Sequence, residues 1–197
     1  PLGSVFVVWQ PGSYRVRTKR GERARALAKT PPAIEIAGPW EVRFPGGWGA
    51  PASKTFPRLV SWTEDAESGV RYFSGVATYR KQLEIPRGFF GDGLRLFLDL
   101  GEVHVIARVR LNGREMGICW TRPYRLEITE AAKPGANLLE VEVANTWSNR
   151  LTGDAQPNAA GLTRTNVRWS ATTPLLPSGL LGPVRILAAR EAELTLG

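Results

Sequence analysis

The chain has 197 residues, of which 43% are hydrophobic and 22% are charged, the balance of an ordinary folded protein. Its 21 glycines and 15 prolines are more than a helical protein tolerates, and its apolar runs are too short to span a bilayer. The composition excludes a disordered tail and a fibrous repeat, and it favours an all-β protein with many turns.

The charge is strongly basic, with 26 lysines and arginines against 18 acidic residues and a net charge of +8. Such a balance favours an anionic partner: nucleic acid, a membrane surface or an acidic polysaccharide. Six of the basic residues lie close together, which is typical of a solvated strand and turn: Arg15, Arg17, Lys19, Arg20, Arg23 and Arg25. No zinc-knuckle spacing, helix-turn-helix pattern or aromatic RNA-binding signature accompanies them, so we expect neither nucleic acid nor a membrane as partner.

The chain begins with two segments that precede the main body. Residues 1–4, Pro-Leu-Gly-Ser, are typical of the scar of a cleaved expression tag and carry no weight for the fold. Residues 5–36 form an N-terminal strand segment with short strands expected at 5–9, 14–17 and 34–36, and with either a helical turn or a basic loop at 20–29. This segment is too small to bury a core alone, so we expect it to dock on the following body or to be the remnant of a preceding domain.

Residues 37–197 are predicted to form one β-sandwich. Polar and apolar residues alternate, as in half-buried strands, along 77–85, 94–100, 107–111, 124–128 and 139–143. Lys81 interrupts the apolar face of the first of these strands, which favours an edge position. Asn112-Gly113 predicts a tight hairpin to a strand at 115–119, because both residues accept a positive φ. Further strands at 40–44 and 184–187, long loops at 45–75 and 145–181, and no helix of convincing length complete an antiparallel sandwich or jelly roll.

Several sequence runs resemble known domains. The runs 75–81, 107–113 with Gly117, and 134–141 resemble the sugar-binding sandwich domain of glycoside hydrolase family 2. Five others resemble the C-terminal, galactose-binding-like sandwich of large bacterial proteins similar to the family 106 α-L-rhamnosidases: 38–42, 59–63, 98–103, 145–154 and 178–184. Together these runs span about 38–186.

The resemblance implies a galactose-binding-like jelly roll attached to a catalytic barrel. In that family the hydrolytic carboxylates belong to the barrel, so this chain is expected to be a non-catalytic accessory part of a secreted or periplasmic enzyme. We expect no cofactor. A structural calcium ion is common in the wider fold, but no clustered Asp and Asn loop supplies enough oxygen ligands here.

Strand reversal predicts a loop-rich end where a ligand would bind, because successive connections of an antiparallel sandwich fall alternately at its two ends. One end is expected to collect Trp48, Trp62, Arg71, Tyr72, His104, Trp120, Arg122, Trp147, Asn149, Arg150, Asp154 and Trp169. Indole rings stack on sugar C–H faces, arginine and amide groups bind hydroxyls, and guanidinium groups also suit a uronate carboxylate. We therefore predict a polysaccharide site, for a plant or microbial glycan that is acidic or contains rhamnose, at Trp62, Arg71, Tyr72, His104, Trp120, Arg122, Trp147, Asn149 and Arg150.

Each of these residues also has a structural interpretation. Trp9 and Trp40 are expected in the core, and Trp62 and Trp147 either plug their loops or form platforms for a ligand. Trp120 with Arg122 is the strongest surface candidate, whereas Arg150 and Asp154 are expected to form an internal ion pair.

The lone cysteine and the lone histidine offer little chemistry. Cys119 cannot form an internal disulfide, and its place in a strand-like run predicts a buried, inert thiol. His104 alone cannot build a metal site, and we expect it to be exposed or hydrogen-bonded rather than to act as a base.

Three functional hypotheses follow. The first is a carbohydrate-binding module, and the second is a scaffold that braces a catalytic barrel without a ligand of its own. The third, ranked last, is a small hydrolase using Glu64 or Asp65: paired acids are the hallmark of glycoside hydrolysis, but Glu64, Asp65 and Glu67 first suggest a solvated turn.

Overall fold

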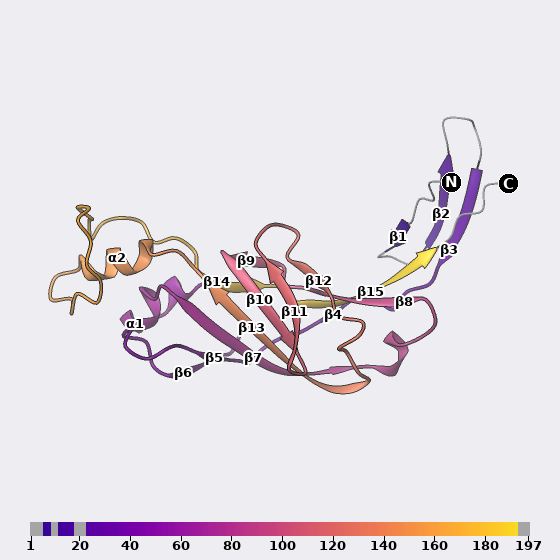
Figure 1. Cartoon of the computed structure of the whole chain (residues 1–197), viewed down its shortest axis with the longest axis horizontal. Helices are drawn as coiled ribbons and strands as arrows, with labels where there is room; N and C mark the ends of the chain where they lie inside the picture. Colours follow the sequence, from indigo (N-terminus) through magenta and orange to yellow (C-terminus); the bar gives the residue numbers. More distant parts are fainter. Residues whose placement is uncertain (1–5, 9–11, 18–22, 193–197) are drawn as a thin grey trace.

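The computed structural model describes residues 6–8, 12–17 and 23–192. Two antiparallel sheets form the layers of a sandwich, so the predicted all-β fold is confirmed (Figure 1). The six-stranded sheet runs in the order β11 (Arg114–Cys119), β10 (Ile106–Leu111), β13 (Gly135–Ala144), β7 (Val76–Ile85), β5 (Trp40–Arg43) and β6 (Ser53–Phe56). The five-stranded sheet contains β1 (Phe6–Val8), β15 (Arg185–Ala192), β8 (Leu94–Asp99) and β12 (Arg125–Glu127), with β4 (Ile34–Glu35) also paired to β15.

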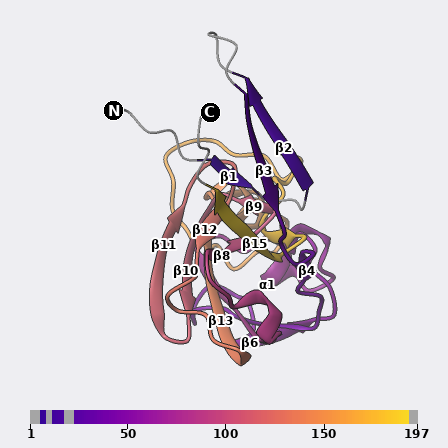
Figure 2. The ribbon, with the colours of Figure 1, turned by 90° about the vertical axis from the view of Figure 1, so that its right-hand side faces the viewer.

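Two small sheets and four short helical segments complete the fold. The pairs are β9 (Glu102–His104) with β14 (Gly179–Gly182) and β2 (Gly12–Arg17) with β3 (Arg23–Ala28). The helical segments are η1 (Trp62–Glu64), α1 (Ser68–Arg71), η2 (Arg87–Phe89) and α2 (Ser148–Asp154). Figures 1 and 2 show the β2–β3 hairpin extending away from the two main sheets. Among the described residues, no helix combines the length and apolar character that crossing a membrane requires.

The predicted alternation produces the core. In β13, Leu139, Val141 and Val143 are fully buried, whereas the intervening glutamates are not. From the opposite sheet, Leu96 and Leu98 of β8 belong to the same buried cluster. Burial of each such side chain contributes about 1.5–3 kcal/mol, which fixes the register of both sheets.

The Asn112-Gly113 hairpin is confirmed. Its two residues have φ values of 53° and 81°, the left-handed pair that a two-residue turn of this kind requires. The Asn112 amide also donates to Asn137 Oδ1 at 2.8 Å, which ties the turn to the start of β13.

Three predictions about the strands were wrong. β7 lies between β13 and β5 rather than at an edge. Lys81 is accommodated there because its Nζ reaches the carbonyl of Pro39 at 2.8 Å and lies 5.9 Å from the centre of the Trp40 ring. Residues 23–28, expected to be a helical turn or loop, form β3, which pairs antiparallel with β2. The expected long loop at 45–75 contains β6, η1 and α1, and the one at 145–181 contains α2 and the start of β14.

Residues that precede position 37 take part in the sandwich sheet. β1 and β4 both pair with β15 of the five-stranded sheet. The expectations for residues 1–4 and for Trp9 lie outside the described residues.

Candidate functional site

At one end of the six-stranded sheet, four neighbouring strands begin or end side by side. Val76 pairs with Ala144, Ala144 pairs with Ile106, and one step inward Ala107 pairs with Cys119. The segments at 120–123 and after 144 therefore leave the sheet from the same end, as strand reversal predicts. The predicted residues nevertheless do not form one continuous rim, because they divide between separate clefts and the core.

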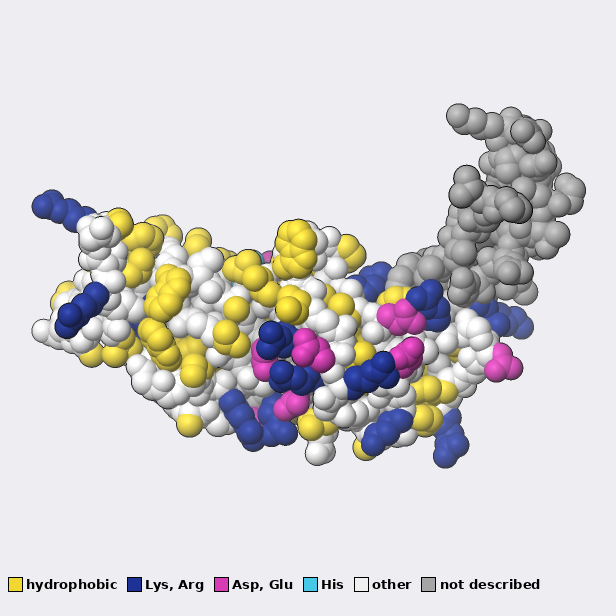
Figure 3. Space-filling view, in the orientation of Figure 1, with side chains coloured by type: hydrophobic (Ala, Val, Ile, Leu, Met, Phe, Trp, Pro, Cys, Tyr) yellow, Lys and Arg dark blue, Asp and Glu magenta, His cyan; other side chains and the backbone are white. Residues whose placement is uncertain are grey.

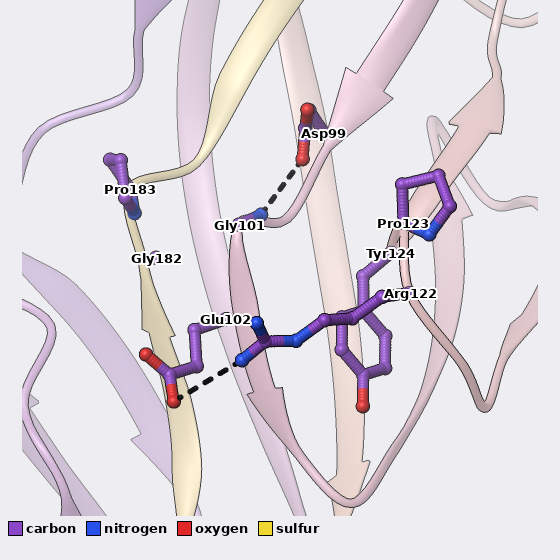
Figure 4. Close-up of a pocket in the computed structure, with 8 residues that line it drawn as sticks. All are labelled: Asp99, Gly101, Glu102, Arg122, Pro123, Tyr124, Gly182 and Pro183. Carbon is purple, nitrogen blue, oxygen red and sulfur yellow. Dashed lines mark hydrogen bonds and ion pairs between the residues drawn. The ribbon is translucent and has the colours of Figure 1, made fainter.

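The Arg122 cleft has a volume of about 500 Å³ and is lined by Asp99, Gly101, Glu102, Arg122, Pro123, Tyr124, Gly182 and Pro183. Figure 4 shows Arg122 reaching across it from the segment before β12 towards Glu102 at the start of β9. Asp99 has a structural role, since it forms an ion pair with Arg125 and accepts a hydrogen bond from the Gly101 amide at 3.0 Å. Glu102 and Arg122 are thus the charged groups that this cleft offers to a ligand.

Glu102 contacts two of the predicted site residues, His104 and Arg122. Its Oε1 lies 2.9 Å from His104 Nε2 and 3.7 Å from the Arg122 guanidinium. His104 is therefore a hydrogen-bonded histidine, on a strand rather than in a loop. The ion pair with Arg122 is weak, because 75% of the Arg122 side chain is exposed, so the guanidinium can turn to a ligand at little cost. Nearby along the chain, Trp120 is 71% exposed.

The Trp147 cleft lies at the end of the molecule, beside α2. It has a volume of about 400 Å³ and is lined by Trp48, Trp147, Leu151, Leu162, Thr163, Arg164 and Thr165. The indole rings of Trp48 and Trp147 meet edge to face, with centroids 5.4 Å apart. Gly69 of α1 lets the backbone just after Trp48 pack closely against this helix, since a Cβ there would lie 1.8 Å from the carbonyl oxygen of Gly49.

A third cleft, here named the Tyr72 cleft, adjoins the Trp147 cleft and shares Leu162 with it. It has a volume of about 330 Å³, and its lining includes Tyr72 and Arg150. Arg150 is buried and forms an ion pair with Asp154 at 3.0 Å, so the predicted internal pair is confirmed. Figure 1 places α2 at the far end of the molecule and β9 and β12 nearer its middle, so the Arg122 cleft is separate from the other two.

Trp62 is not a platform for a ligand. Its side chain is completely buried and packs edge-on against Phe44 and Phe73 and parallel to Tyr79. The sequence alone did not decide whether Trp62 plugs its loop or forms a platform for a ligand, and the structure places it in the core. Trp40 is fully buried as predicted.

Asn149 is also unavailable to a ligand. It is buried, its Nδ2 donates to the Leu176 carbonyl and to Ser178 Oγ, and its Oδ1 accepts from the Leu176 amide. All of these bonds tie the 156–178 segment to α2. Trp169 also ties this segment to α2, because its Nε1 donates to Thr152 Oγ1 at 2.9 Å.

The acidic cluster next to Trp62 has structural partners. Glu64 closes a capping box with Ser61, and Lys54 pairs with Asp65 at 2.6 Å and Glu67 at 3.2 Å. Arg71, a predicted site residue, donates from Nε to the Asp65 carbonyl at 2.9 Å. This part of the predicted site therefore organises a turn.

Within the described part of the chain, the clefts contain neither a reactive thiol nor a metal-binding cluster. Cys119 is buried, and burial together with the nearby Asp99 charge raises the pKa of its thiol. Among the described residues, no three His, Cys, Asp or Glu side chains are grouped so that they could hold a metal ion.

Asp154 links α2 to the rim of the Trp147 cleft. Burial acts to raise the pKa of this carboxyl, but hydrogen bonds from Thr163 and Leu162 and the charge of Arg150 outweigh it, so the pKa lies below its usual value. A carboxyl whose pKa is lowered by folding stabilises the protein above its unfolded pKa, and this contribution is lost as the pH falls through the folded pKa.

We therefore expect the free energy of unfolding to fall more steeply below about pH 4 in the natural chain than in an Asp154→Asn variant. Urea titrations at a series of pH values measure this slope. Asp92→Asn, at an exposed turn position, is the control and should keep the natural slope. Equal slopes for Asp154→Asn and the natural chain would contradict the assignment.

Sequence reasoning missed several lining residues. Glu102 follows the strand predicted at 94–100 and Tyr124 begins the strand predicted at 124–128, and neither was singled out as a candidate although Arg122 was. Arg164 lies in a segment without hydrophobic periodicity, so its charge was the only sequence signal that could have marked it as a candidate.

Comparison with known proteins decides the family. The family described as "Glycosyl hydrolase 2 galactose-binding domain-like" matches residues 62–176, more than half of the chain. This chain belongs to that family.

The galactose-binding-like domain is similar to parts of much larger proteins. It is 34% identical to "Putative beta-glucuronidase" of Formosa agariphila, and the match covers 93% of this chain and 18% of that protein. It shares 43% identity and a TM-score of 0.75 with the structure of a rhamnosidase from Novosphingobium sp. PP1Y, covering 83% of this chain and 16% of that one. A beta-glucuronidase of Ruminococcus gnavus, at 19% identity and a TM-score of 0.59 over 80% of this chain and 28% of its own, shares the fold. The domain thus spans less than a fifth of the first two relatives.

Proposed function

We propose that this domain is a non-catalytic accessory module of a glycoside hydrolase similar to the family 106 α-L-rhamnosidases, and that it binds plant or microbial polysaccharide at the Arg122 cleft. The observation that carries the proposal is the 43% identity to a rhamnosidase of which the domain spans 16%. In such an enzyme the rest of the polypeptide supplies the catalytic domain, and the enzyme works in the periplasm or outside the cell.

The chemistry of the Arg122 cleft suits a neutral sugar. Neighbouring hydroxyls of a pyranose can donate to the Glu102 carboxylate and accept from the Arg122 guanidinium, and Tyr124 supplies an aromatic wall. The exposed indole of Trp120 adds a surface on which the C–H face of a second sugar unit can stack.

The arrangement of acids supports a non-catalytic role. Hydrolysis of a glycosidic bond needs two carboxyl groups that face the bond from opposite sides. Glu64 is engaged in a cap, and Asp65 and Glu67 in ion pairs with Lys54, so a reaction there would first have to break these contacts.

Titration calorimetry with a panel of neutral, rhamnose-containing oligosaccharides tests this proposal. We expect Arg122→Ala to weaken binding about ten-fold or more, because a charged hydrogen bond contributes about 1.5–3 kcal/mol. Arg43→Ala, which removes an exposed arginine on β5, is the matched control and should bind like the natural domain. Absence of heat with every oligosaccharide, or equal affinity of the two variants, would contradict the proposed site.

A purely structural role is the second candidate, favoured by one feature of the six-stranded sheet. At its strand ends Val76, Ile106, Ile118 and Trp120 are exposed to between 41% and 71%. Figure 3 shows hydrophobic side chains spread over this end, with the charged side chains gathered further along the sheet. Such a surface suits docking against the rest of the enzyme, and self-association or binding of a hydrophobic dye by the isolated domain would favour this role.

A further inference from the structure

We infer that the Trp147 cleft is a second saccharide site, distinct from the Arg122 cleft, and that it takes a sugar carrying a carboxylate, such as a uronic acid unit of an acidic polysaccharide. This inference rests on the proposed carbohydrate-binding function and names the ligand class for a different part of the surface.

The cleft presents a fixed aromatic platform. Trp147 is 54% exposed although Trp48, which packs against the core, contacts it edge to face. An exposed indole held by a partly buried one loses little conformational freedom when a ligand stacks on it. The C–H face of a pyranose ring supplies the complementary apolar surface.

The lining of the same cleft also contains an arginine. Arg164 is exposed, and it has no ion pair or hydrogen bond to any residue in the described part of the chain. A planar guanidinium binds a carboxylate through two parallel hydrogen bonds, a geometry that a neutral hydroxyl cannot reproduce.

The rim is held in place before a ligand arrives. The Thr163 amide and hydroxyl both donate to Asp154 Oδ2, and Thr165 Oγ1 accepts from the Val167 amide at 3.1 Å. Asp154 is in turn paired with Arg150 of α2. Arg164 therefore directly follows a residue that is anchored to α2, which reduces the entropic cost of binding.

The local charge favours an anion. Between positions 145 and 178 the chain contains one acidic residue, Asp154, and three basic ones, Arg150, Arg164 and Arg168. Because Arg150 neutralises Asp154, the two remaining arginines leave this end positive. In Figure 3 basic side chains project from this end, on the left of the view, and the acidic side chains visible on this face lie further along the molecule.

The two clefts differ in how they would treat a carboxylate. Glu102 lines the Arg122 cleft and would repel a second negative charge, whereas the described residues that line the Trp147 cleft include no acidic one. The volume of about 400 Å³ lies within the range of small-ligand sites, about 300–1,000 Å³. The structure thus separates a neutral-sugar cleft from an acidic-sugar cleft.

Titration calorimetry with an oligogalacturonate and its fully methyl-esterified counterpart tests the inference, because the two probes differ in charge and share their sugar backbone. We expect the free acid to bind about ten-fold or more tightly than the ester, and Arg164→Ala to abolish this preference. Trp147→Ala should weaken binding of both probes. Arg168→Ala, an exposed arginine of the same segment outside the lining, is the matched control and should retain the preference.

Equal affinity for acid and ester, absence of binding by both, or equal behaviour of Arg164→Ala and Arg168→Ala would overturn the inference. Arg122→Ala separates the two sites: it should leave oligogalacturonate binding unchanged and weaken binding of neutral, rhamnose-containing oligosaccharides. If the acidic probe fails while the neutral ligand still binds in an Arg122-dependent manner, the second site falls and the proposed function stands.

Discussion

Replacing Trp62 by alanine is expected to lower the free energy of unfolding by about 3–5 kcal/mol, the usual cost of removing a large aromatic side chain from a packed core. Trp62 is completely buried, and three aromatic rings surround it with centroid distances between 5.3 and 6.3 Å. A cavity there cannot be refilled without moving η1, because the Trp62 amide also donates to the Ser178 carbonyl at 3.0 Å.

Urea unfolding of the variant measures this loss directly. The matched control is Trp120→Ala, which removes the same side chain from a position that is 71% exposed. We expect the control to stay within about 0.5 kcal/mol of the natural domain. Similar losses in the two variants would contradict the division of the tryptophans into core and surface residues.

Replacing Asn149 by alanine is expected to lower the free energy of unfolding by about 1–3 kcal/mol, because it removes the hydrogen bonds of a buried side chain, among them the one to the buried Ser178 hydroxyl. The amide of Leu176 loses its acceptor at 2.8 Å, and the carbonyl of Leu176 loses the donor at 2.7 Å but keeps the one from Ser178 Oγ at 3.0 Å. These bonds hold the 156–178 segment on α2, so their loss should also loosen the rim that carries Arg164.

Hydrogen exchange of the backbone amides distinguishes this local effect from general destabilisation. We expect faster exchange at Leu176 and Thr163 in Asn149→Ala, and unchanged exchange in the centres of β7 and β13. Asn166→Ala, at an exposed position of the same segment, should exchange like the natural domain. Identical exchange patterns in the two variants would show that Asn149 does not anchor the segment.

The strands of the sandwich could be predicted because burial on one face imposes a period of two. β13 shows this directly: Leu139, Val141 and Val143 point into the core and alternate with glutamates. Lys81 was misinterpreted because a lysine can lay its apolar stem along a neighbouring ring and still carry its charge to a partner. A charged residue in a strand therefore does not by itself identify an edge.

The candidate site could be predicted only in part. Strand reversal correctly gathered the segments after β11 and β13 at one end, and the exposure of Trp120, Arg122 and Trp147 agrees with that prediction. Burial of Trp62 was readable in principle, since Ser61 and Glu64 have the spacing of a capping box and mark a turn packed by its tryptophan. The role of Asn149 was not readable, because its partners lie 27 or more residues away in a segment without periodicity.

The central claim is that exposed aromatic and arginine side chains at the loop-rich end bind saccharides while the buried aromatics only hold the fold. Proton–nitrogen spectra of the domain, recorded during titration with a neutral rhamnose-containing oligosaccharide and then with an oligogalacturonate, test it most directly through the indole N–H signals. The account predicts that the signal of Trp120 shifts with the first ligand, that those of Trp147 and Trp48 shift with the second, and that those of Trp40 and Trp62 stay in place. Indole signals that do not move with either saccharide, or shifts confined to Trp40 and Trp62, would contradict it.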